Sequence, residues 1–205
     1  MTENAADDLN AAHNEAMRKL KAEREALMET KTEEKGLLLV HTGDGKGKSS
    51  AAFGMVARAL GWGMKVGIVQ FVKGNWQTGE KLFFSKFKDE VRFEVMGDGF
   101  TWDTQNRARD VASAERAWAT AKEMINDPTY TFVLLDEINI ALRYDYLDIA
   151  EVVTFLKNRP NDKHVCLTGR NAKPELIEIA DLVTEMTLIK HPFDQGVIAQ
   201  RGVDF

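Results

Sequence analysis

The chain has 205 residues, of which 44% are hydrophobic and 29% charged, a composition typical of a globular protein with a closed core. Its formal net charge is −5 and its lysines and arginines are scattered, which argues against a protein that binds the backbone of nucleic acids. The single cysteine, Cys166, excludes an internal disulfide, and the acidic N-terminus and the lack of an apolar run of ~18 residues predict a cytoplasmic protein with no membrane partner.

Residues 1–35 differ in composition from the rest of the chain and are predicted to form an N-terminal helical arm. The stretch "NEAMRKLKAEREALMETKTEEK" contains no glycine or proline and is rich in residues that favour helix. Its apolar stripe is thin, consisting of Leu9, Met17, Leu20, Leu27 and Met28. Two interpretations stay open: a solvated helix, or an arm that docks over the body or onto a partner subunit.

Residues 36–205 alternate short apolar runs with helical patterns. The predicted strands are 36–40, 65–72, 91–96, 130–137, 164–169 and 182–189. The predicted helices are 48–63, 105–126, 148–160 and 173–180, whereas 78–89 has a mixed pattern. Because runs such as "LLLV" and "FVLLD" are apolar without alternation, we expect strands that are covered on both faces. The alternation of strands and helices predicts one α/β domain with a doubly wound, mainly parallel sheet.

The stretch "TGDGKGKSS" at residues 42–50 connects the first predicted strand to the first predicted helix of this domain. A helix N-terminus presents unpaired N–H groups and partial positive charge to an anion, and glycines let the preceding loop approach it closely. Gly47, Lys48 and Ser49 match the end of the pattern G-x-x-x-x-G-K-[ST], but Thr42 occupies the position of its first glycine. The sequence therefore predicts a loop that binds the phosphates of a nucleotide, rather than a glycine-rich surface turn.

Two carboxylates, Asp136 and Glu137, follow the apolar residues of "TFVLLDE". An acidic residue at the end of a strand beside a phosphate loop is placed to hold Mg²⁺, which prefers oxygen ligands. The alternative is an acidic residue that only caps the following helix.

Two large aromatic residues, Phe100 and Trp102, lie in "GDGFTWDTQNR" at 97–107, after the predicted strand 91–96. Ligands of open α/β sheets bind beyond the carboxyl ends of the strands, so these aromatics are candidates for an apolar wall of the site. Packing in the core is the alternative.

From Gly36 to Phe205 the chain resembles the P-loop class of corrinoid adenosyltransferases. The shared segments are "HTGDGKGKSSAAFGM", "VQFVKGNW", "GFTWDTQNR", "VLLDEINIALRYDYL", "LTGRNA" and "KHPFDQGVIAQRGVDF". The resemblance implies a P-loop NTPase-like (RecA-like) fold and the transfer of the 5′-deoxyadenosyl group of ATP to Co(I) of a corrinoid, with release of triphosphate. Because the nucleophile attacks the ribose C5′ carbon, no phosphate is transferred and no general base is required.

The resemblance also implies roles for individual residues. The phosphates of ATP are expected to bind Thr42, Gly43, Asp44, Gly45, Lys46, Gly47, Lys48, Ser49 and Ser50. Mg²⁺ is expected to bind Ser49 and Glu137, with Asp136 as a second candidate. Phe100 and Trp102 are expected to crowd the lower face of the corrinoid and exclude its axial ligand, which favours reduction to Co(I).

Further expectations from the resemblance concern ATP contacts and partners. Arg58 and Arg170 are implied ATP contacts, with surface or ion-paired arginines as the alternative. The arm is similar to a family segment that folds over the corrinoid, often in a homodimer. The corrinoid is cobalamin, cobinamide or a cobyrinic acid derivative, and a flavin-type reductase is a candidate electron donor.

Two departures from the family pattern concern the loop. Asp44 stands where the family often has asparagine, and Ser49 and Ser50 stand where it often has two threonines. Serine ligates Mg²⁺ as threonine does, but the Asp44 carboxylate should repel polyphosphate unless Lys46 or Mg²⁺ compensates. Competing readings are a phosphotransferase or ATPase, a nucleotide switch that binds DNA or a partner, and a corrinoid carrier or sensor without turnover.

Overall fold

A computed structural model describes residues 3–72, 77–96 and 106–204 of the chain. The chain divides into two compact units, Met1–Glu34 and Lys35–Phe205. The first unit contains α1 (Glu3–Glu29), and its side chains from residue 10 to residue 34 are exposed. No helix in the described ranges is both long and apolar enough to cross a membrane.

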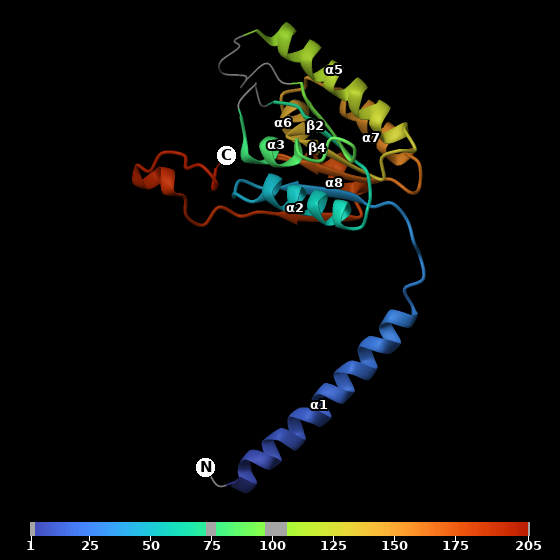
Figure 1. Ribbon diagram of the computed structural model, residues 1–205, viewed down its shortest axis with the longest axis vertical. Helices are drawn as coiled ribbons and strands as arrows, with labels where there is room; N and C mark the ends of the chain where they lie inside the picture. Colours follow the sequence, from blue (N-terminus) through green and yellow to red (C-terminus); the bar gives the residue numbers. More distant parts are fainter. Residues whose placement is uncertain (1–2, 73–76, 97–105, 205) are drawn as a thin grey trace. The chain divides into compact units, whose positions relative to one another are not determined.

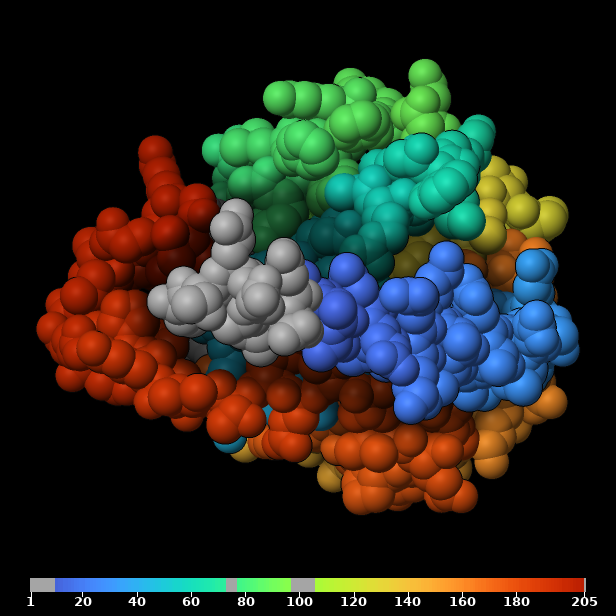
Figure 2. Space-filling model, turned by 90° about the horizontal axis from the view of Figure 1, so that it is seen from below, coloured from blue at the N-terminus to red at the C-terminus, as the bar shows by residue number. Residues whose placement is uncertain are grey.

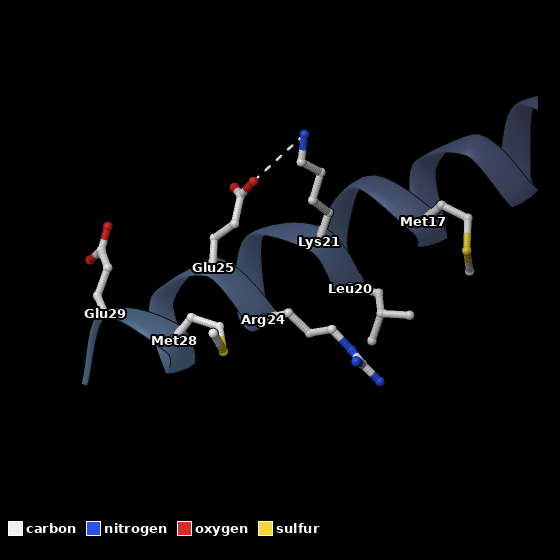
Figure 3. Close-up of a pocket in the computed structure, with 7 residues that line it drawn as sticks. All are labelled: Met17, Leu20, Lys21, Arg24, Glu25, Met28 and Glu29. Atoms are coloured by element: carbon white, nitrogen blue, oxygen red, sulfur yellow. Dashed lines mark ion pairs between the residues drawn. The ribbon is translucent and has the colours of Figure 1, made fainter. Parts of the chain in front are cut away.

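The helix α1 carries its apolar side chains along one side. Figure 3 shows Met17, Leu20 and Met28 on that side, while the ion pair between Lys21 and Glu25, 3.6 Å apart, lies on another. Met28 is 69% exposed, so the stripe buries little within the first unit. Burial against other parts of a protein normally supplies most of the stability of such a helix.

A six-stranded sheet forms the centre of the second unit, with the strand order β3-β2-β4-β5-β1-β6 and all neighbouring strands parallel. The strands are β1 (Leu38–Thr42), β2 (Val66–Gln70), β3 (Val91–Val95), β4 (Phe132–Asp136), β5 (His164–Thr168) and β6 (Leu182–Glu185). Every residue of β1, β2 and β4 is buried, as expected for strands covered on both faces. The prediction of a doubly wound, parallel α/β fold is confirmed.

The helices of the second unit follow the strands along the chain (Figure 1). They are α2 (Lys48–Gly61), α3 (Gly79–Phe84), α5 (Arg107–Asn126), α6 (Ile138–Arg143), α7 (Ile149–Lys157) and α8 (Pro174–Ile179), with a 3₁₀ turn at Pro192–Gln195. The predicted helices correspond to α2, α5, α7 and α8. The sequence pattern missed α6, because six residues are too few to display a helical period.

Alternate strand residues face two hydrophobic cores on opposite faces of the sheet. On one face Ile68, Leu134 and Cys166 pack with Phe53 and Val56 of α2. On the other face the strands pack against α5, α6, α7 and α8, whose core side chains include Ala117, Trp118, Ile138, Val152 and Leu176. The site at the carboxyl ends of the strands thus rests on a sheet that is held from both sides.

The segment after β6 differs from the sequence prediction, which extended this strand to residue 189. The strand ends at Glu185, because the Met186 carbonyl accepts a hydrogen bond from Gly45 N instead of continuing the ladder. The following residues form a lobe (red in Figures 1 and 2) with exposed apolar side chains, among them Ile189 and Phe193, which are 92% and 75% exposed.

Candidate active site

The phosphate loop runs from the end of β1 to the start of α2, and two of its glycines adopt backbone angles that other residues rarely adopt. Gly43 has φ +95° and Gly47 has φ +113°. A Cβ atom on Gly43 would lie 2.4 Å from the Met186 carbonyl oxygen, so this glycine lets the segment after β6 pack directly on the loop. The displaced first glycine of the motif therefore has a structural reason in this chain.

The loop delivers Lys48 to the first position of α2, where no side chain caps the helix N-terminus. Lys48 is only 8% exposed, and its Nζ donates a hydrogen bond to the Gly45 carbonyl oxygen at 2.6 Å. Burial lowers the pKa of Lys48, whereas the nearby Glu137 acts in the opposite direction. A buried amine beside free helix N–H groups is well suited to bind polyphosphate, because the anion would restore the stabilisation that burial removes.

A cavity of about 460 Å³ opens over this helix N-terminus. Most of the predicted phosphate-binding residues line it, namely Gly45, Lys46, Gly47, Lys48, Ser49 and Ser50, together with Glu137 and Arg170. Its other lining residues are Val72, Glu80, Ile140, Arg143, Tyr144, Val203 and Asp204. The cavity therefore joins a basic, amide-rich end to a wall that combines apolar, aromatic and charged side chains.

The remaining predicted residues of the loop do not line the cavity. Thr42 is buried, and its hydroxyl accepts a hydrogen bond from Ala172 N at 2.9 Å, which ties the loop to the segment after β5. Asp44 is exposed, and one of its carboxylate oxygens lies 4.0 Å from Arg170 Nε. Arg58 is exposed in the last turn of α2, ten residues beyond Lys48 and so about 15 Å along the helix axis.

The structure distinguishes the two acidic residues at the end of β4. Asp136 is fully buried, and its carboxylate oxygens accept hydrogen bonds from Gln70 Nε2 and Thr168 Oγ1, both at 2.8 Å. Glu137 is partly exposed and lines the cavity. Glu137 makes no side-chain cap to α6, so the alternative role as a helix cap is not supported. Of these two carboxylates, Glu137 is the one that lines the cavity.

The donors in the cavity fit Mg²⁺. Ser49 and Glu137 supply a hydroxyl and a carboxylate, the hard oxygen ligands that Mg²⁺ prefers, and phosphate oxygens and water complete its usual shell. No group of three or more histidine, cysteine, aspartate or glutamate residues gathers elsewhere in the described ranges to form a protein-only metal site. The donor set therefore suits a cation that arrives with a nucleotide.

The C-terminal residues reach the phosphate loop, a contact that sequence reasoning did not find. The Asp204 carboxylate pairs with Lys46 Nζ and also accepts a hydrogen bond from Gln200 N at 2.8 Å. The hydrogen bond from Lys46 lowers the pKa of Asp204. The only sequence signal was that Asp204 lies in "KHPFDQGVIAQRGVDF", one of the segments that carry the resemblance, because no spacing rule links residues so distant in the chain.

Arg143 and Tyr144 were also missed, although they lie in a segment that carried the resemblance. The Arg143 guanidinium lies 5.5 Å from the centre of the Tyr144 ring, and both residues line the cavity. The predicted aromatic wall, Phe100 and Trp102, lies outside the described residues.

Comparison with known proteins gives a consistent result. The sequence model of the family described as ATP:corrinoid adenosyltransferase BtuR/CobO/CobP matches residues 34–205. The chain is 60% identical over 198 residues to a corrinoid adenosyltransferase of Sinorhizobium sp, covering 96% of this chain and 92% of that protein. It is 52% identical over 202 residues to a corrinoid adenosyltransferase of Pseudomonas aeruginosa (98% and 100% covered) and 44% identical over 193 residues to that of Escherichia coli K12 (94% and 97% covered).

Proposed function

Because this chain belongs to the ATP:corrinoid adenosyltransferase family, we propose that its cavity binds ATP with the triphosphate on the loop at residues 42–50. The chain is an adenosyltransferase that moves the 5′-deoxyadenosyl group of ATP to the cobalt of a corrinoid. The observation that carries the assignment of the site is a single cavity lined by Lys48, Ser49, Glu137 and Arg170.

The reaction needs anion stabilisation and no proton transfer. The Co(I) corrinoid, a substrate, attacks C5′ of the ribose, so that a cobalt–carbon bond forms while the bond from C5′ to the triphosphate oxygen breaks. Lys48 and the N–H groups at the start of α2 stabilise the negative charge that develops on the leaving triphosphate. Arg170, at the edge of the cavity, adds a further positive charge.

Mg²⁺ would be held by Ser49 and Glu137, and it would supply electrostatic stabilisation of the phosphate oxygens. Asp136 supports this site from behind, because both its oxygens accept hydrogen bonds from neighbouring strands. The contact of Arg58 with ATP remains a prediction. Arg58 lies about 15 Å along α2 from Lys48, so it would have to meet a part of ATP distant from that lysine.

Phe100 and Trp102 are proposed to exclude the lower axial ligand of the corrinoid. The expected result of Phe100→Ala or Trp102→Ala is impaired reduction of Co(II), with ATP affinity nearly unchanged. Spectroscopic reduction of the corrinoid and ATP titration would measure the two quantities separately, and equal losses in both would contradict the role. The arm folding over the corrinoid, the homodimer, the cytoplasmic location and a flavin-type reductase as electron donor also remain predictions.

The decisive experiment mixes the protein, MgATP and chemically reduced corrinoid under anaerobic conditions. We expect a visible spectrum that shows a light-sensitive alkylcobalt product, together with one triphosphate per product. A phosphotransferase or ATPase, the main alternative, would instead release ADP. Glu137→Gln should raise the Mg²⁺ concentration needed for half-maximal ATP binding, which tests the metal site independently of corrinoid chemistry.

A further inference from the structure

The residue that carries the cavity carboxylate, Glu137, has an unusual backbone. Its φ is +65°, in the left-handed region that residues other than glycine rarely occupy. Such conformations persist where the surrounding structure holds them, and they are common at functional sites. Contacts from neighbouring residues must therefore hold the backbone of Glu137 in this conformation.

The end of β5 supplies the first of these contacts. The Glu137 N–H donates a hydrogen bond to Thr168 Oγ1 at 2.9 Å, and the same hydroxyl donates to Asp136 Oδ1 at 2.8 Å. The other oxygen of Asp136 accepts from Gln70 Nε2 at 2.8 Å. Gln70, Asp136 and Thr168 are at most 2% exposed, so water cannot substitute for a lost partner without a change in structure.

This chain of hydrogen bonds crosses three adjacent strands, β2, β4 and β5. The Thr168 hydroxyl stands at its centre, because it accepts from the main chain of Glu137 and donates to the side chain of Asp136. Buried networks of this kind fix geometry when every member has a partner. The backbone of Glu137 is thereby tied to the sheet through its N–H group, while its carbonyl oxygen accepts a hydrogen bond from Ile140 N of α6 at 3.1 Å.

Gly169 provides the second contact, this time with the carboxylate. Its φ is +128°, and a Cβ built on it would lie 3.3 Å from Glu137 Oε2 and 2.9 Å from Asn139 Cβ. The Gly169 carbonyl also accepts a hydrogen bond from Asn139 Nδ2 at 3.0 Å. The missing side chain of Gly169 thus leaves the space into which the Glu137 carboxylate and the start of α6 fit.

We propose that Thr168 and Gly169 are positioning residues that set the place of the Glu137 carboxylate for a divalent cation bound with ATP. Thr168 holds the backbone of Glu137 in its left-handed conformation, and Gly169 leaves room for its side chain. Neither residue lines the cavity, so both act through Glu137. The inference depends on the proposed role of Glu137 in binding Mg²⁺.

The test compares Thr168→Val, which removes the hydroxyl at similar volume, with Thr168→Ser, which keeps it. Binding of ATP is titrated against Mg²⁺ and again in EDTA without metal. We expect Thr168→Val to raise the Mg²⁺ concentration at half-saturation by about tenfold or more, as is usual when a partner of a metal ligand is removed. Binding of metal-free ATP should stay within about twofold, and Thr168→Ser should restore most of the Mg²⁺ dependence.

A matched control is Thr184→Val, the same substitution on the exposed strand β6, for which we expect wild-type Mg²⁺ dependence. Thermal unfolding of every variant shows whether a weaker Mg²⁺ dependence arises in folded protein or from loss of the fold. If Thr168→Val does not fold, Gly169→Ala provides the second test, since its Cβ would lie 2.9 Å from Asn139 Cβ at the start of α6 and 3.3 Å from Glu137 Oε2, and Thr168 itself is unchanged.

The outcomes separate this inference from the proposed function. The positioning role is overturned if folded Thr168→Val shows the Mg²⁺ dependence of the wild type. If Thr168→Val does not fold, the same result in folded Gly169→Ala overturns it. The metal role of Glu137 still stands in either case if Glu137→Gln weakens the Mg²⁺ dependence of ATP binding. Unchanged Mg²⁺ dependence in Glu137→Gln overturns both. An equal loss of metal-free and Mg²⁺-dependent ATP binding in Thr168→Val would mean a general structural role, and it too would overturn the inference.

Discussion

The glycines around the phosphate loop give a prediction whose magnitude comes from the local geometry. Gly43 and Gly47 both have positive φ, but a Cβ on Gly43 would meet the Met186 carbonyl oxygen at 2.4 Å, whereas one on Gly47 would meet nothing nearer than 3.9 Å. Gly54, in the exposed part of α2, has open space around its position and helical backbone. Substitution of each by alanine therefore separates conformational strain from steric overlap.

The expected free energies of unfolding follow from these distances. Gly47→Ala should cost about 1–3 kcal/mol, because alanine must adopt an unfavourable backbone conformation. Gly43→Ala should cost about 1–3 kcal/mol more, because the overlap is with backbone atoms that cannot turn away. Gly54→Ala should be neutral or stabilise by about 0.5–1 kcal/mol, since alanine favours helix.

Thermal unfolding measures these differences directly. For a domain of this size about 1 kcal/mol corresponds to a shift in Tm of about 2–4 °C, so Gly43→Ala should melt about 2–12 °C below Gly47→Ala. Repeating the melts with MgATP tests the loop, because a ligand that binds only the folded state raises Tm. We expect Gly43→Ala to lose most of that increase and Gly54→Ala to keep it.

The order of the three variants in thermal stability tests whether the contact with Met186 constrains the loop. If Gly43→Ala is as stable as Gly47→Ala, the segment at Met186 does not press on the loop as the geometry requires. If Gly54→Ala is as destabilised as either, the losses reflect a general intolerance of α2 and its loop to alanine.

Three further predictions concern single side chains. Burial raises the pKa of the Cys166 thiol to about 12, so at pH 8 the fraction of thiolate is about a thousandfold smaller than for an ordinary thiol. Cys166 should therefore react with a disulfide reagent only when the protein unfolds, and fast labelling of the native protein would refute this. Asp204→Asn removes the carboxylate that competes with polyphosphate for Lys46, so calorimetry should show that MgATP binds about two- to fivefold more tightly. The same substitution in a Lys46→Met protein should give no such gain, and weaker binding of MgATP would mean that Asp204 orients Lys46. Asp44→Asn should bind ATP at least as tightly as wild type in the same assay, because Asp44 is exposed beside the site and repels phosphate; a clear loss would show a role for its carboxylate.

Features that depend on residues adjacent in the chain could be predicted from the amino-acid sequence. The apolar runs before Thr42 and Glu137 predicted buried parallel strands, because strands covered on both faces need no polar alternation. Gly47, Lys48 and Ser49 predicted the phosphate loop, because positive φ, a basic side chain and a helix N-terminus are local requirements.

Contacts between residues far apart in the chain could be found only in the folded protein. The spacing of Asp136 and Glu137 could not tell which carboxylate faces the cavity, because this depends on Gln70 and Thr168 of the adjacent strands β2 and β5. The order of the strands also brings residues far apart in the chain to one edge of the sheet, and the C-terminal segment then folds back to place Asp204 on Lys46. Side-chain contacts of this kind follow from packing and chain topology, for which no period or motif in the sequence stands as a signal.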